Sequence, residues 1–321
     1  MIKPIGGYFE WEFPANNGSF PHSDGVLLNS GRHSLEYILM SLGTIKRLWI
    51  PYYTCDVVLQ PIERLGISYS FYRINKDFTL AEEIALSEDE YVIYTNYFGL
   101  MDAYCKEMAK RYGNQLILDC AQAFFAPRLE GINTFYSPRK FVGIPDGGIA
   151  YANTPTSLEL PKDHSYDKCA HLLKRHDLTP MDGYSDFKES SHKIALSPIS
   201  LMSTLSQKVM SSLNYEAIKE RRLTNFTLLH THLAASNEFQ MPSYDSFACP
   251  MVYPYYTKDE ELRKRLITNQ VFVATYWPNV FEWIKDGEME YELSKNIIPI
   301  PIDQRYDDKD MMRIVELINQ K

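Results

Sequence analysis

The residues with the clearest chemical potential follow a series of short apolar runs. Asp119 ends one run, the next run leads into a turn that carries Ser137 and Lys140, and a Pro-Asp-Gly-Gly turn follows at 145–148. A lysine amine can form a Schiff base with an aldehyde, and a carboxylate can pair with a ring nitrogen. Hydroxyl and backbone N–H groups can bind a phosphate. Together these groups are the parts of a pyridoxal phosphate site.

Strands and helices that alternate must position these groups. The pattern predicts strands at 27–30, 47–51, 68–73, 91–95, 115–118, 132–136 and 149–152, and helices after Ser30 and at 57–66, 78–86 and 102–112. Such alternation is typical of an α/β fold with a mostly parallel sheet. Open α/β sheets bind ligands at the carboxyl ends of their strands, so we expect the candidate residues to meet at one edge.

The segment Asp-Cys-Ala-Gln-Ala (119–123), the strand and Ser-x-x-Lys turn that follow it, and the later Gly-Gly pair resemble the DegT/DnrJ family. This family comprises pyridoxal phosphate-dependent aminotransferases of fold type I that act mostly on nucleotide-linked keto-sugars. The resemblance implies a mostly parallel central sheet with helices on both faces and a small C-terminal α+β domain. We expect a cofactor-binding large domain with an N-terminal arm over 1–198, and long linking helices with the small domain over 199–321.

The resemblance also implies roles for individual side chains. Lys140 and Asp119 would be the catalytic residues, Lys140 as the Schiff-base lysine and Asp119 as the partner of the pyridine nitrogen. Gln122 would lie near the phenolic oxygen of the cofactor.

A phosphate site is expected where Ser30-Gly31 opens a helix directly after a strand. The free N–H groups and the positive end of the helix dipole attract an anion there, although an ordinary strand–helix turn has the same local pattern. The family has Ser-Gly-Thr at this point, and Arg32 replaces the threonine with a cation. Ser137 would be a further phosphate ligand, although the family usually has its serine two residues upstream, at the position of Phe135.

The family places an aromatic residue against the pyridine ring. In strict register that position is Cys55, so we expect Tyr53 to take the role. Two tyrosines packed at a strand end, without contact to a cofactor, are an equally simple explanation of the Tyr52-Tyr53 pair.

Residues 153–195 are polar and poorly periodic, which predicts a long loop. The family's Gly-x-Asn-x-Arg-Met motif, which reaches the neighbouring subunit, is not found there. We nevertheless expect this stretch to contact a second subunit, because a long polar segment in a compact domain usually has a partner or a function. Four histidines in it lack metal-binding spacing and indicate a solvated loop, so no metal site is expected: His164, His171, His176 and His192.

The ends of the chain carry weaker patterns. Residues 1–25 predict an irregular segment that lies over the body, and residues 199–232 predict one or two long helices. The C-terminal third predicts strands at 249–256, 271–277 and 296–302, and helices at 258–269 and 307–319.

Composition limits the class of protein. With 321 residues the chain can bury a large core, and its net charge of -8 argues against general binding of nucleic acid or a membrane surface. No apolar run has the length of a transmembrane helix, and the first residues lack the apolar core of a signal peptide. Five cysteines without CxxC or metal spacing are typical of reduced thiols in the cytoplasm.

These observations predict an aminotransferase that moves an amino group from glutamate to a keto-sugar and works as a homodimer. Two alternatives remain open at this point. One is a pyridoxal phosphate-dependent lyase or dehydratase, although family members that dehydrate sugars carry histidine at the position of Lys140. The other is a degenerate relative that binds the cofactor or a nucleotide without turnover.

Overall fold

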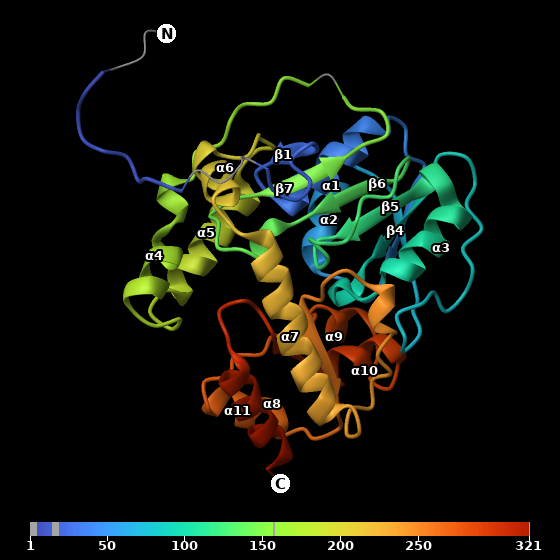
Figure 1. Cartoon of the computed structure of the whole chain (residues 1–321). Coiled ribbons are helices and arrows are strands. Elements are labelled where there is room, and N and C mark those ends of the chain that lie inside the picture. Colours follow the sequence, from blue (N-terminus) through green and yellow to red (C-terminus); the bar gives the residue numbers. More distant parts are fainter. Residues whose placement is uncertain (1–4, 15–18, 157, 321) are drawn as a thin grey trace.

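Seven strands form the central sheet of the computed structural model, which describes residues 5–14, 19–156 and 158–320. Their order is β1-β7-β6-β5-β4-β2-β3, and β6, β5, β4, β2 and β3 run parallel, whereas β7 is antiparallel to both of its neighbours. The strands are β1 (Val26–Leu28), β2 (Arg47–Pro51), β3 (Tyr69–Tyr72), β4 (Glu90–Thr95), β5 (Leu116–Cys120), β6 (Asn133–Tyr136) and β7 (Gly148–Tyr151) (Figure 1). The predicted α/β fold with a mostly parallel sheet is confirmed.

Helices cover both faces of this sheet because successive strand residues point to opposite sides. Ile93 and Ile117 pack with α1 (Gly31–Ser41) and α2 (Leu59–Arg64) in one apolar cluster. Tyr94 and Leu118 point the other way, into a larger cluster that includes α3 (Asp102–Tyr112) and the C-terminal elements. The sheet is thus held between two apolar layers, and this packing fixes the position of the edge at which the candidate residues lie.

The C-terminal part is built on a second, two-stranded antiparallel sheet, β8 (Val252–Tyr256) with β9 (Ile297–Pro301). The long helix α7 (Tyr215–Leu233) runs from the side of the large sheet to this small one (Figure 1). The other helices here are α6 (Thr204–Ser211), α8 (Leu262–Thr268), α9 (Val280–Trp283), α10 (Met289–Asn296) and α11 (Asp308–Asn319). The division at residue 198/199 stays a prediction.

The helix predicted at 78–86 is wrong. Phe78 has a positive φ of 66°, and the Asp77 carboxylate accepts hydrogen bonds from N and Oγ1 of Thr79, which closes a turn. The backbone N–H groups of Leu80 and Ile84 donate to tyrosine hydroxyls from α3. Tertiary partners therefore replace the intrahelical hydrogen bonds that the apolar spacing suggested.

The strand predicted at 271–277 is also wrong, because no described strand pairs with this stretch. The carbonyl oxygen of Ala274 is taken instead by the Arg263 guanidinium at 2.5 Å.

The loop predicted at 153–195 contains two helices, α4 (Ala170–Asp177) and α5 (Tyr184–Leu196). His171, His176 and His192 therefore lie on helices. Among the described residues, no group of three or more His, Cys, Asp and Glu side chains could hold a metal ion. No helix in the described ranges combines the length and apolar character needed to cross a membrane.

The N-terminal arm does not lie over the body along its whole length. Tyr8 and Phe9 are more than nine-tenths exposed, and the trace of residues 5–14 leads away from the sheet (Figure 1). Closer to β1 the chain does pack, since Phe20 is buried and the His22 ring stacks on Tyr136 at 3.8 Å. Residues 1–4 and 15–18 of the predicted arm lie outside the described residues.

Candidate active site

Asp119 is the second-last residue of β5, near the middle of the sheet, and is only 6% exposed. Its Oδ1 accepts a hydrogen bond from the Ala121 backbone N–H at 2.8 Å. Burial raises the pKa of the Asp119 carboxyl, and the positive charge of Lys140 acts in the opposite direction. A carboxylate in this setting is costly unless a cation pairs with it, so Asp119 is ready to receive a protonated nitrogen.

Lys140 lies at the end of the short 3₁₀ turn Pro138–Lys140, which follows β6. Its side chain is exposed, and Nζ forms no hydrogen bond or ion pair with any described residue. The charge of Lys140 nevertheless acts on both the Asp119 carboxyl and the Cys55 thiol, so the three side chains lie within electrostatic reach of one another. An amine that is accessible and unpaired is free to react with an aldehyde.

Gln122 is 1% exposed and lies just after β5. Its Oε1 accepts a hydrogen bond from the Phe98 N–H at 3.0 Å, which fixes the amide. The other end, Nε2, is buried and has no partner among the described residues. A buried amide that donates to nothing is normally rare, which marks a place where an acceptor from a ligand belongs.

The start of α1 and the turn after Lys140 meet at the expected phosphate site. A methyl group on Gly31 would lie 3.1 Å from Cβ and 3.4 Å from Oγ of Ser137, so these two residues are in contact. Gly148 approaches so closely that an added Cβ would lie 2.2 Å from the carbonyl of Ser30. Gly148 is therefore required by space, because only a residue without a side chain lets the turn after Lys140 approach Ser30 at the helix start.

Arg32, in the first turn of α1, adds a cation at the same place. Its Nε and Nη1 atoms are buried without a hydrogen-bond partner in the described chain. Burial lowers the pKa of Arg32, and the charge of Arg64 lowers it further. Arg64 is itself paired with Glu36 at 2.8 Å, so Arg32 is the member of this group that lacks an anion.

Tyr53 lies in an aromatic cluster. Its side chain is fully buried, and its ring centroid is 5.0 Å from that of Trp277 and 5.5 Å from that of Tyr97. Cys55, the residue in strict family register, is half-buried, and Lys140 acts on the pKa of its thiol, which burial raises. The structure thus brings Cys55 to the site, and a stacking role for Tyr53 stays a prediction.

Asp146 anchors the turn that follows Lys140, a role that the sequence did not reveal. Its buried carboxylate accepts hydrogen bonds from N and Oγ of Ser203, at 2.8 and 2.6 Å, and from the Ser206 hydroxyl. Ser203 is also the N-cap of α6, so the Pro-Asp-Gly-Gly turn is fixed to that helix.

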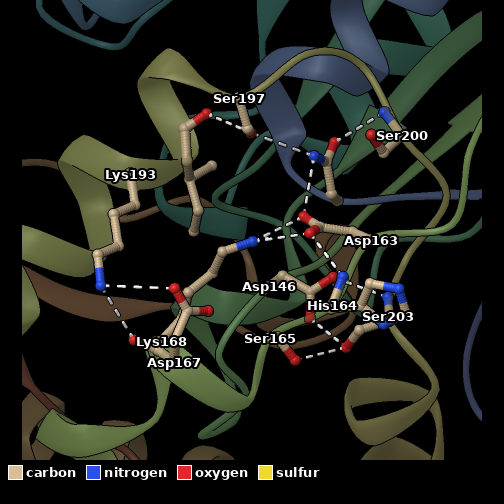
Figure 2. A network of polar contacts seen from close by, with 12 residues as sticks. Asp146, Asp163, His164, Ser165, Asp167, Lys168, Lys193, Ser197, Ser200 and Ser203 are labelled. Carbon is tan, nitrogen blue, oxygen red and sulfur yellow. Dashed lines mark hydrogen bonds and ion pairs between the residues drawn. The ribbon is translucent and has the colours of Figure 1, made fainter.

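A neighbouring network fixes the strand that leads into α1. Both carboxylate oxygens of Asp163 accept hydrogen bonds from Nζ of Lys168 at 2.8 Å, and Asp163 also accepts from Asn29 at 3.1 Å. Figure 2 shows Asp163 between Ser197 and Ser200 on one side and Asp146, with Ser165 and Ser203, on the other. Because Asn29 immediately precedes Ser30-Gly31, part of segment 153–203 supports the phosphate end of the site.

These residues fit pyridoxal phosphate. The described chain offers a buried carboxylate, an unpaired amine, a buried amide donor and a half-buried guanidinium whose Nε and Nη1 lack a hydrogen-bond partner. Each lacks a partner that a different part of this cofactor could supply.

The fold is that of the DegT/DnrJ/EryC1/StrS aminotransferases. The structure is similar to S. venezuelae DesV in complex with a ketimine intermediate, with a TM-score of 0.66 and 16% identity over 92% of this chain and 83% of DesV. It is similar to the sugar aminotransferase CalS13 from Micromonospora echinospora, with a TM-score of 0.63 and 15% identity over 91% and 86% of the two chains. A DegT DnrJ EryC1 StrS aminotransferase from Brucella abortus gives a TM-score of 0.61 and 14% identity over 91% and 84%. No family model and no curated protein matches the sequence.

Proposed function

We propose that this chain is a pyridoxal phosphate-dependent aminotransferase that moves an amino group from glutamate to a nucleotide-linked keto-sugar. The observation that carries the proposal is the unpaired amine of Lys140, whose charge acts on the buried carboxylate of Asp119. The aminotransferases of the same fold, one of them described as a sugar aminotransferase, support the substrate class.

Each side chain has a part in the proposed reaction. When bound, pyridoxal phosphate supplies an electrophilic carbon and an electron sink. Nζ of Lys140 would hold the cofactor through its aldehyde carbon, and as a free amine it would take the proton from Cα of the amino donor as a general base. Asp119 stabilises the positive charge on the ring nitrogen, because a nearby anion favours the charged form. Gly31, Arg32 and Ser137 hold the phosphate, and Gln122 donates to the phenolic oxygen.

Two measurements test this proposal. Borohydride reduction followed by peptide mapping should place the pyridoxyl label on Lys140, and addition of glutamate should convert the bound cofactor to its amine form. A label on another lysine contradicts the assignment of Lys140. A label on Lys140 without conversion by any amino donor would identify a degenerate relative, and release of ammonia without amine-form cofactor would identify a lyase.

We also propose that the protein is a homodimer in the cytoplasm. Helix α5 and the turn that joins it to α4, at the end of this polar segment, expose large apolar side chains, with Leu196 at 74%, Met181 at 60% and Tyr184 at 58%. Exposed apolar patches of this kind are typical of interaction sites, and symmetric dimers are the commonest oligomers. The five cysteines, all within the described residues, are free, which supports a reducing compartment.

Light scattering tests the dimer. Leu196→Glu together with Met181→Glu should shift the mass from dimer to monomer, because two charges would be buried in the interface. Ile267→Glu, at 43% exposure on α8, is the matched control and should leave the mass unchanged. A wild-type monomer that binds pyridoxal phosphate tightly would contradict the proposed role of this surface.

A further inference from the structure

The carbonyl oxygen of Phe141, the residue next to Lys140, receives two hydrogen bonds from the C-terminal part of the chain. Nε2 of Gln304 donates to it at 2.9 Å, and Nη2 of Arg222 donates at 3.3 Å. Phe141 also closes the turn of Lys140, since its N–H donates to the Pro138 carbonyl at 2.8 Å. The backbone on the far side of Lys140 is therefore fixed by residues that lie far away in the sequence.

Arg222 and Gln304 form a closed set of contacts around this carbonyl. Nε of Arg222 donates to Oε1 of Gln304 at 3.1 Å, which orients the Gln304 amide so that its Nε2 faces Phe141. Nη1 of Arg222 donates to the Met251 carbonyl at 3.1 Å, and the guanidinium lies 4.6 Å from the centre of the Phe141 ring. Each of the three guanidinium nitrogens thus donates one hydrogen bond, to Gln304, to Met251 or to Phe141.

The burial of Arg222 is unusual. Its side chain is 2% exposed, and among the described residues no carboxylate lies within ion-pair distance of it. Burial lowers the pKa of Arg222. The negative charge of Asp303 acts on the guanidinium without forming an ion pair, and the direct hydrogen-bond partners are all neutral. Placing a guanidinium in the interior on such terms is expensive, and an apolar side chain of similar size would fill the same space at lower cost. The role of Arg222 therefore lies in the groups that its hydrogen bonds hold in place.

The same hydrogen bonds lead on to Gln122. The Met251 N–H donates to the Phe98 carbonyl at 2.7 Å, and the Phe98 N–H donates to Oε1 of Gln122 at 3.0 Å. Met251 thus connects Arg222 to Phe98, and through it to the amide that the proposed function places at the cofactor ring.

We propose that Arg222 and Gln304 are positioning residues for Lys140, which couple the seating of the C-terminal part to the placement of the reactive amine. This inference rests on the proposed function, since it assumes that Lys140 binds the cofactor covalently. It assigns Arg222 and Gln304 no contact with substrate or cofactor.

The ratio of two dissociation constants isolates this effect. Pyridoxal phosphate binds through its ring, its phosphate and Lys140, whereas pyridoxamine phosphate lacks the aldehyde and binds through ring and phosphate alone. The affinity of apoprotein for the aldehyde form relative to the amine form therefore reports how well Lys140 is placed. A general loss of structure would weaken both forms together and leave the ratio unchanged.

Gln304→Glu is the sharpest variant because it keeps shape and the acceptor that faces Arg222. It replaces the donor at 2.9 Å from the Phe141 carbonyl with a second oxygen. We expect about a tenfold loss of the preference for the aldehyde form, the upper end of what one lost hydrogen bond gives. Binding of the amine form should change less than about twofold. The melting temperature should hold or rise, since the new carboxylate pairs with Arg222.

Arg222→Lys tests the same point with the charge retained, because an ammonium lacks the planar fork that reaches three acceptors. It should also lower the preference for the aldehyde form. Leu233→Ala is the control on the same helix: Leu233 is fully buried at the far end of α7 and its side chain makes no hydrogen bond to the turn of Lys140 or to the loop of Gln304. It should lower the melting temperature and leave the ratio unchanged.

Two results would overturn the inference. If both folded variants, Gln304→Glu and Arg222→Lys, keep the wild-type ratio while Lys140 takes the borohydride label, the positioning role is wrong and the proposed function stands. If wild-type Lys140 takes no label, the proposed function fails and this inference fails with it.

Discussion

Asp119→Asn separates the chemical role of this carboxylate from its effect on stability. The amide keeps the shape of the side chain and can still face a ring nitrogen, but it carries no charge to keep that nitrogen protonated. A hydrogen bond to a charged group contributes about 1.5–3 kcal/mol. Because Asp119 is 6% exposed, solvent screens the contact little and the upper part of this range applies. A loss of about 2.7 kcal/mol corresponds to a rate roughly 100-fold lower.

The same substitution should raise the stability of the apoprotein although it lowers the reaction rate. Burial raises the pKa of Asp119 in the folded chain above its value of about 4 in the unfolded chain. The folded state then favours the protonated form, so the stability from this group is present below pH ~4 and is lost as the pH rises through the raised value. The Asn variant lacks this loss, and its stability advantage over wild-type apoprotein should grow between pH 4 and neutrality.

The assay pairs single-turnover kinetics with urea unfolding of both apoproteins at several pH values. The conversion of bound cofactor by glutamate gives the rate, and the difference between the two unfolding curves isolates Asp119 from other titrating groups. Near-normal turnover in the variant would refute the role at the ring nitrogen. A stability difference that stays flat with pH would refute the claim that the apoprotein holds an unfavourable charge.

Three further results are expected. Gly148→Ala should abolish tight binding of the cofactor, measured by equilibrium dialysis, because the new methyl group would lie 2.2 Å from the Ser30 carbonyl; retained binding would contradict the close approach. Lys168→Ala should cost about 3–5 kcal/mol in urea unfolding, because it leaves the Asp163 carboxylate buried without its cation. Lys168→Met combined with Asp163→Leu should recover most of this loss. Iodoacetamide should alkylate Cys55 slowly at neutral pH, since burial raises its pKa, and bound cofactor should slow the reaction further, as followed by mass spectrometry.

The strands and the first long helices could be predicted because their signals are local. Arg47–Pro51 was expected to the residue, since an apolar run ends at a proline, and so was Asp102–Tyr112, which ends at Gly113 with a positive φ of 53°. Lys140 and Asp119 follow such strands directly. The strand pattern together with the rule for ligand sites in open α/β sheets therefore brought them to one edge.

The wrong predictions of secondary structure share a different cause. At 78–86 the apolar spacing was helical, but tyrosine hydroxyls from α3 supply acceptors for Leu80 and Ile84 and hold an irregular turn. At 153–195 the helices α4 and α5 are rich in polar residues and α4 has no buried residue, and ion pairs such as Lys174 with Asp186 hold the two helices together. Such contacts arise between segments, so no window of sequence contains them.

The supports of the site were hidden for the same reason. Arg222 and Gln304 look like ordinary residues of a helix and a loop, and only the folded chain brings them to Phe141. Asp146 read as a turn residue, although its carboxylate is bound by α6.

The contact between Gln304 and Phe141 also has a consequence for synthesis on the ribosome. The two residues are 163 positions apart, so the turn that carries Lys140 leaves the exit tunnel long before one of its two distant hydrogen-bond donors exists. At about 5–20 residues per second, the delay is roughly 8–33 s. During this interval the sheet can assemble from β1 to β7, but the amine remains on a turn without its final supports. Loading with cofactor is therefore a late event, and a nascent chain that stops short of Gln304 should be folded in its first half yet poor at capturing an aldehyde.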